Sequence, residues 1–129
     1  MIGSKKFLLL SVLTILLMFG CDYFRSDVNK YVVNIKFSGG ANGEKPESVS
    51  AIIGADKFWW TSLEAGEEKT VNLFSDKNAV NNLTLLYTFG GRQKTWESTN
   101  YAENADYRIN LTIDSEGSVT ENSCRLPCR

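Results

Sequence analysis

The chemistry open to this chain of 129 residues is limited by its complete lack of histidine. Histidine is the commonest general base and the commonest metal ligand, so Ser–His and Cys–His catalysis is excluded. A pair of carboxylates can still hydrolyse glycosides. The acidic residues, however, stand mostly in segments of turn composition, where water solvates them. The acidic residues in such segments are Glu64, Glu67, Glu68, Asp76, Glu103, Asp106, Asp114 and Glu116. We therefore expect no catalytic residue, no metal site and a non-enzymatic protein.

Aromatic residues give the chain its clearest binding character. Phe58, Trp59 and Trp60 are consecutive, and neighbours on a strand point to opposite faces of the sheet. Either Trp59 is exposed and anchors a partner, as Trp often does at interfaces, or one Trp is in the core and a loop covers the other. We take Trp59 and Trp60 as the first candidate partner-binding residues. A second candidate patch consists of Tyr87, Arg92, Lys94 and Trp96.

The first 20 residues have the layout of a secretory signal. Lys5 and Lys6 precede an apolar run over residues 7–20, and Gly20 stands directly before Cys21. A charged region, an apolar region and a small residue at the cleavage point define such a signal. With Cys21 in the next position, the segment resembles a bacterial lipoprotein signal. An ordinary secretory signal is an alternative, and so is an uncleaved anchor, although the run is shorter than the roughly 20 residues that span a bilayer.

The resemblance implies that Cys21 becomes the lipidated N-terminus of the mature protein. Two or more acyl chains would anchor it stably in a membrane, and this covalent lipid is the only cofactor we expect. Asp22, directly after Cys21, resembles the signal that retains enterobacterial lipoproteins in the inner membrane. The expected location is therefore the bacterial cell envelope, facing the periplasm, with the inner membrane favoured by Asp22.

Charge and length narrow the possible partners. Residues 1–20 hold two of the 14 basic residues and none of the 15 acidic ones, so the remainder has a net charge of −3. Nucleic acids and polybasic membrane contacts need clustered Lys and Arg, and both are excluded on this ground. After the signal and a polar tether over residues 21–30, residues 31–129 suffice for one domain. They are too few for a core plus a large buried cavity, so no small-molecule ligand is indicated.

If Cys21 carries lipid, the remaining cysteines are Cys124 and Cys128, close to the end of the chain. In an oxidising envelope we expect a disulfide between them. The small ring would stabilise the fold by about 2 kcal/mol on the loop-entropy model and would tie down only the chain end. A redox-active or metal-binding pair is the alternative, although redox motifs use Cys-x-x-Cys and zinc needs more ligands.

The rest of the chain alternates apolar and polar residues with a period of two, which is typical of half-buried strands. Gly90-Gly91 predicts a hairpin with a two-residue turn, in which Tyr87 faces Lys94. We expect a small antiparallel β-sandwich, broadly similar to the immunoglobulin-like or transthyretin-like folds, with a small β-barrel as the alternative. The eight expected strands span residues 31–37, 48–53, 58–61, 69–74, 83–89, 92–96, 107–113 and 118–120.

These features favour a lipid-anchored envelope protein that binds another protein. It would be an accessory subunit of an envelope assembly, or an immunity or inhibitor lipoprotein whose acidic segment 63–68 meets a basic surface. The alternative is an envelope protein that binds glycan or peptidoglycan, with Trp59 or Trp96 stacked on sugar rings. Two coplanar exposed rings in a groove would favour glycan, and a single protruding aromatic residue would favour protein.

Overall fold

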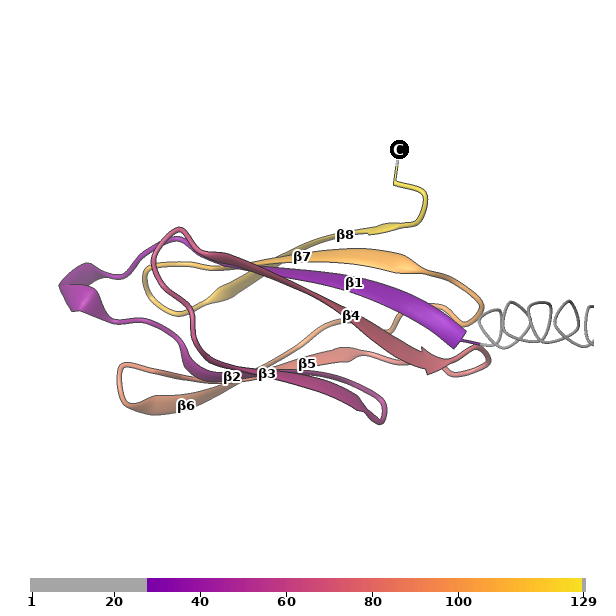
Figure 1. The fold of residues 1–129 in the computed structure, drawn as a ribbon, viewed down its shortest axis with the longest axis horizontal. Helices are drawn as coiled ribbons and strands as arrows, with labels where there is room; N and C mark the ends of the chain where they lie inside the picture. Colours follow the sequence, from indigo (N-terminus) through magenta and orange to yellow (C-terminus); the bar gives the residue numbers. More distant parts are fainter. Residues whose placement is uncertain (1–27, 129) are drawn as a thin grey trace, which may run out of the picture.

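Two four-stranded sheets pack face to face in the computed structural model, which describes residues 28–128 (Figure 1). The first sheet has the order β4 (Glu68–Asp76), β1 (Val28–Phe37), β7 (Tyr107–Ile113) and β8 (Val119–Arg125). The second has the order β3 (Asp56–Ser62), β2 (Glu47–Ile53), β5 (Leu83–Phe89) and β6 (Arg92–Glu97). A short 3-10 turn, η1 (Ala41–Gly43), lies between β1 and β2. The sheets are not closed into a barrel, so the predicted sandwich is confirmed and the barrel alternative is wrong.

Strand β1 shows how the alternating pattern builds the core. Tyr31, Val33, Ile35 and Phe37 are at most 1 % exposed, because every second side chain points between the sheets. The predicted strand began at residue 31, but β1 begins at Val28. The last three residues of the predicted tether over residues 21–30 therefore belong to the sandwich.

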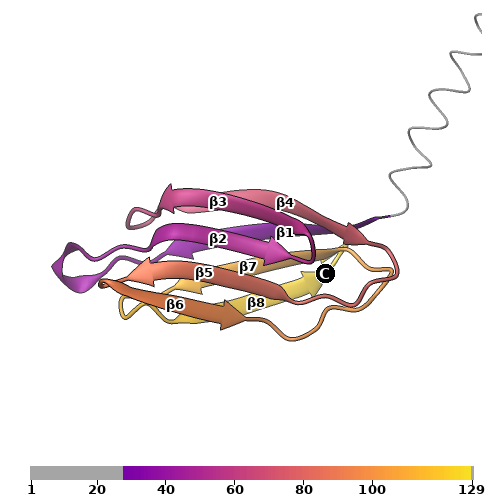
Figure 2. The ribbon, with the colours of Figure 1, turned by 90° about the horizontal axis from the view of Figure 1, so that it is seen from below.

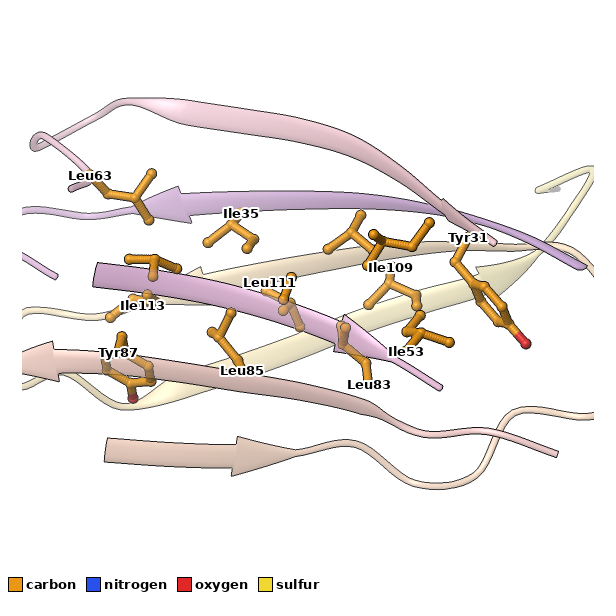
Figure 3. Packing of buried hydrophobic residues seen from close by; sticks show 14 of the residues in the cluster. Tyr31, Ile35, Ile53, Leu63, Leu83, Leu85, Tyr87, Ile109, Leu111 and Ile113 are labelled. Atoms are coloured by element: carbon orange, nitrogen blue, oxygen red, sulfur yellow. The ribbon is translucent and has the colours of Figure 1, made fainter. Parts of the chain in front are cut away.

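The core lies between the four central strands, β1 and β7 of one sheet and β2 and β5 of the other. Figure 3 shows Ile35, Leu85 and Leu111 pointing into this layer from three of these strands. Complete burial of each such aliphatic side chain stabilises the fold by about 1.5–3 kcal/mol relative to exposure.

The pairing of β1 with β7 is parallel, with Tyr31 beside Tyr107 and Phe37 beside Ile113. The other strand pairs in the described residues are antiparallel. The expectation of a wholly antiparallel sandwich is therefore wrong at this pair. No hairpin joins β1 to β7, so no short turn forces them to run in opposite directions.

Strand order distinguishes this sandwich from the immunoglobulin constant type that the sequence suggested. Immunoglobulin constant-type domains place their first and second strands in one sheet. Here β1 and β2 belong to different sheets, and the chain crosses between the sheets after β1, β3, β4 and β6.

The Gly90-Gly91 hairpin has the predicted register. Phe89 pairs with Arg92, Tyr87 with Lys94 and Leu85 with Trp96. Both glycines have positive φ angles, 59° and 74°, which a tight turn of this kind requires and which glycine adopts without steric cost.

The predicted bond between Cys124 and Cys128 is also present, with the two Cα atoms 5.5 Å apart. Cys124 pairs with Arg108 near the end of β8, which is longer than the predicted strand over residues 118–120. The disulfide therefore fixes the last residues against an edge strand of the first sheet.

Residues 78–82 contain no helix, and Asn81 forms an isolated bridge with Tyr101. Over residues 28–128 there is no helix long and apolar enough to cross a membrane. The predicted signal over residues 1–20 and the lipidation site at Cys21 lie outside the described residues.

Replacing a fully buried central residue should strongly destabilise the sandwich. Leu111→Ala should lower the free energy of unfolding by about 2–5 kcal/mol, through lost burial and the cavity that remains. Thr112→Ala, on the opposite face of the same strand, is the matched control and should cost much less. Urea unfolding followed by circular dichroism would measure both, and similar losses in the two variants would contradict the assignment of faces.

Stability should also fall in alkali because of buried tyrosines. Burial, with the nearby Glu121 carboxylate that accepts its O–H at 2.8 Å, raises the pKa of Tyr101 above its ordinary value of 10.0. Burial likewise raises the pKa of Tyr87. Unfolded tyrosines ionise near pH 10, so this contribution is intact below that pH and is lost as the pH rises beyond it.

Urea unfolding at a series of pH values from about 8 to about 11 would show this loss. The decline should be shallower in Tyr101→Phe, which has no ionisable phenol at this position. An equally steep decline in the variant would show that Tyr101 is not responsible.

Candidate functional site

The candidate site is built on β3, an edge strand that pairs only with β2. An edge strand presents a row of backbone N–H and C=O groups without a partner in its own sheet. Directly opposed residues of an antiparallel pair share a face, and buried Val49 and Ala51 face the core. Their partners Trp60 and Phe58 therefore lie on the inner face, and Trp59 lies on the outer face.

Two of the three aromatic rings are open to solvent. Trp59 is 54 % exposed and Phe58 is 45 % exposed, whereas Trp60 is half-buried against the core. The alternative in which a loop covers Trp59 is therefore wrong, while its role in binding stays a prediction.

The side of the sandwich beside β3 is hollowed. The rings of Phe58 and Trp60 have centroids 5.0 Å apart and planes tilted by 54°. A hollow of about 510 Å³ lies against them. It is lined by Phe58, Trp59, Trp60, Thr61, Ser62, Glu64, Glu67 and Lys69. Aromatic rings thus stand beside hydroxyl and charged groups within one open groove.

The acidic segment 63–68 is less free than its composition suggested. Leu63 is completely buried and holds the start of this segment against the core. Glu64 pairs with Lys45 at 2.7 Å, and this hydrogen bond raises the pKa of Lys45. Glu67 lies 3.7 Å from the ammonium group of Lys69. Because Glu64 and Glu67 are paired with lysines, the segment presents a weaker negative potential to a basic partner.

Edge strands are usually protected from pairing with other chains by charges, proline or a bulge. In β3 the charged residues, Asp56 and Lys57, stand at the start, and residues 58–62 carry none. On the neighbouring edge, the Asp56 carboxylate accepts the backbone N–H of Phe74 in β4 at 2.9 Å. One donor on the free side of β4 is therefore occupied.

The free side of β3 can be assigned from one hydrogen bond. The N–H of Lys57 donates to the carboxylate of Asp56 at 2.9 Å instead of to β2. In an antiparallel pair, alternate residues direct their backbone groups toward and away from the partner strand. Trp59 and Thr61 share the parity of Lys57, so we assign their N–H and C=O groups to the outward side.

The second candidate patch is not assembled as an exposed surface. Tyr87 is only 4 % exposed, and its hydroxyl donates to the carbonyl of Gly117. Trp96 is half-buried against the core. Among Tyr87, Arg92, Lys94 and Trp96, only Arg92 is exposed.

The ammonium group of Lys94 contacts other residues of the same domain. Its Nζ lies 5.8 Å from the ring centroid of Phe89 and donates to the carbonyl of Glu116 at 3.3 Å. The recorded cation–aromatic contact is therefore diagonal, to Phe89, and not to the opposed Tyr87. Strands β3 and β6 form the two opposite edges of the second sheet (Figure 2), so the two candidate patches do not meet.

Sequence reasoning missed a third group of exposed apolar residues, namely Val28, Phe74 and Val80. Each adjoins a polar or buried neighbour in the sequence, so no run of apolar residues marks them. Phe74 directly follows the buried Leu73, and strand alternation alone places it on the outer face.

Comparison with known proteins adds no assignment, since no family model and no curated protein matches the sequence. Within residues 28–128, no group of three or more Cys, Asp and Glu side chains is placed to hold a metal ion. The case for β3 therefore rests on its geometry.

The different surroundings of the two tryptophans give a stability test. Trp59→Thr should change the free energy of unfolding by less than about 0.5 kcal/mol, since an exposed strand residue contributes little. Trp60→Thr should cost more than about 1 kcal/mol, because that ring packs on the core. Denaturant unfolding of both variants tests this order, and a larger loss for Trp59 would mean that its ring is covered.

Proposed function

We propose that the protein is a lipid-anchored envelope protein that binds another protein through β3 and catalyses no reaction. The observation that carries the proposal is the edge position of β3 together with the exposure of Phe58 and Trp59. Uncovered aromatic rings beside an open strand edge combine two sources of affinity, ring burial and backbone pairing.

In the proposed complex, an extended segment of the partner adds to the second sheet beside β3. Its backbone bonds to the outward groups of Trp59 and Thr61. Its alternate side chains meet Trp59 on one face and the groove with Phe58 and Trp60 on the other. Backbone bonds supply affinity in this mode, and the side-chain pockets supply specificity.

The geometry favours an accessory subunit over an inhibitor with a protruding acidic loop. Leu63 is buried, and Glu64 and Glu67 are paired with lysines. An inhibitor of a basic toxin would gain affinity and association rate from an unpaired acidic loop. A subunit of an assembly needs instead a stable strand edge on which its partner can pair.

Binding of glycan or peptidoglycan is less well supported. A sugar platform needs exposed rings in one plane, but the planes of Phe58 and Trp60 are tilted by 54°. Trp59 points to the other face, and Trp96 lies at the opposite edge of the sheet. The capture experiment below therefore also tests glycan binding.

Anchoring through Cys21 is the part of the proposal that rests on the sequence. Cys21→Ser should abolish acylation and move the protein from the membrane fraction to the soluble fraction. Intact mass and fractionation of native and variant chains measure this directly. Unchanged membrane association of the variant would contradict the anchor and leave the β3 proposal standing.

The binding site is tested by crosslinking the full lipidated chain in its native envelope and identifying the captured molecules by mass spectrometry. Trp59→Ala should weaken capture of a dominant protein by about tenfold or more, as expected for loss of an interface anchor. Thr95→Ala, exposed on the outer edge strand β6, is the matched control and should leave capture unchanged.

Thr61→Pro tests the backbone part of the interaction. Proline removes an N–H that we assign to the free side of β3, where an edge strand tolerates its loss. The variant should retain its circular dichroism spectrum and lose the partner. Equal capture by all variants would contradict the site, and retention of peptidoglycan fragments without a protein would move the glycan function to first place.

A further inference from the structure

The third group of exposed apolar residues lies at one end of the sandwich. Val28 begins β1, Phe74 stands near the end of β4, and Val80 follows in the loop toward β5. Their side chains are 39 %, 43 % and 57 % exposed. The end at which β1 begins is also where β4 ends and where β2 turns into β3 (Figure 2).

A shallow hollow of about 410 Å³ lies at this end of the molecule. Val28 and Phe74 line it together with small residues of the β2–β3 turn and the β4–β5 loop. Its full lining is Val28, Gly54, Ala55, Phe74, Ser75, Asp76, Ala79 and Asn81. The surface is therefore mostly small and apolar, with Val80 next to two of the lining residues in the chain.

Three carboxylates at this end accept backbone hydrogen bonds. Asp56 accepts the N–H groups of Lys57 and Phe74. Asp76 accepts that of Asn78 at 3.3 Å, and Asp106 accepts that of Lys30 at 2.8 Å. Two exposed lysines, Lys30 and Lys77, also lie here. Apolar side chains between lysines match the boundary between lipid headgroups and acyl chains.

Chain length places this end close to the proposed anchor. Seven residues separate Cys21 from Val28, and they span at most about 25 Å when fully extended. Strand β1 has 10 residues, so the opposite end of the sandwich lies about 30 Å further away. A lipid on Cys21 would thus keep the end with Val28 within reach of the bilayer.

We propose that this end, through Val28, Phe74 and Val80, docks on the surface of the membrane that holds the lipid anchor. The inference rests on the acylation of Cys21 in the proposed function and adds a fixed orientation of the domain. Docking makes the long axis of the sandwich point away from the bilayer surface. Strand β3 then begins near the membrane, at Asp56, and runs away from it to Ser62.

Depth-dependent fluorescence quenching tests the orientation. The full lipidated chain, carrying an environment-sensitive dye at Asn78→Cys, is reconstituted into vesicles of phosphatidylethanolamine and phosphatidylglycerol that contain a brominated lipid. Asn78 is exposed beside Val80. The matched control carries the dye at Ser115→Cys, an exposed position in the β7–β8 turn at the opposite end.

We expect quenching at position 78, none at position 115, and loss of quenching when Phe74→Ser and Val80→Ser are added to the chain labelled at 78. Val80→Ser alone, in a loop, should reduce quenching without any effect on folding. No quenching at position 78 in chains whose acylation is confirmed by intact mass would overturn docking and leave the anchor intact. Quenching at both positions would mean that the domain lies on its side, which also overturns the proposed orientation.

Other occupants of the hollow give different signals. The dye at position 78 could report an apolar environment even without vesicles. If Phe24→Ser then changes its fluorescence, the tether fills the hollow. A signal that depends on protein concentration would mean that a second copy does so. Either result overturns membrane docking, and an unacylated Cys21 overturns both the anchor and the inference that rests on it.

Discussion

The structure depends on the burial of the inner faces of its four central strands. Residues such as Ile35, Leu85 and Leu111 are excluded from water only because both sheets are present. Neither sheet could bury these side chains alone, so the stability of each sheet depends on the other. A slip of one residue would move a whole apolar row from the core to the solvent, which is why the alternating pattern specifies the faces so strongly.

Face-to-face packing leaves the sides of the sandwich only partly covered, and the edge strands β3, β4 and β6 differ in how they are protected. On β4, Asp56 bonds to a free backbone N–H. On β6, Lys94 lies over Phe89 and places a charge beside the core, a device that protects edges from pairing. The centre of β3 has neither protection, and its two exposed aromatic rings make it the edge best suited to a partner.

The proposed anchor and the proposed partner site occupy different parts of the same frame. The apolar end with Val28 and Phe74 is where the chain leads back toward Cys21, whereas β3 runs along one side. A domain that is docked by its end keeps its side accessible. This arrangement explains how exposed apolar residues at the end and exposed aromatic residues at the side can serve separate contacts without competing.

Much of the architecture was readable from local sequence, because period-two alternation, a Gly-Gly turn and closely spaced cysteines act over short distances. These features predicted the half-buried strand over residues 31–37, the hairpin register and the terminal disulfide, all of which are present. They also singled out the Phe58–Trp60 segment, but alternation states only that Trp59 opposes its neighbours and not which face is solvated.

The features that only the tertiary structure decided depend on contacts between residues far apart in the sequence. The parallel pairing of β1 with β7 joins strands that no turn connects, so nothing near either strand in the sequence encodes their direction. Tyr87 is buried although it is paired with Lys94. The aliphatic part of an edge lysine can cover the core while its ammonium group bonds to a polar partner, here the carbonyl of Glu116. Sequence by itself determined the strands and their faces, and only the packing of two sheets determined which edges, rings and ends remain open.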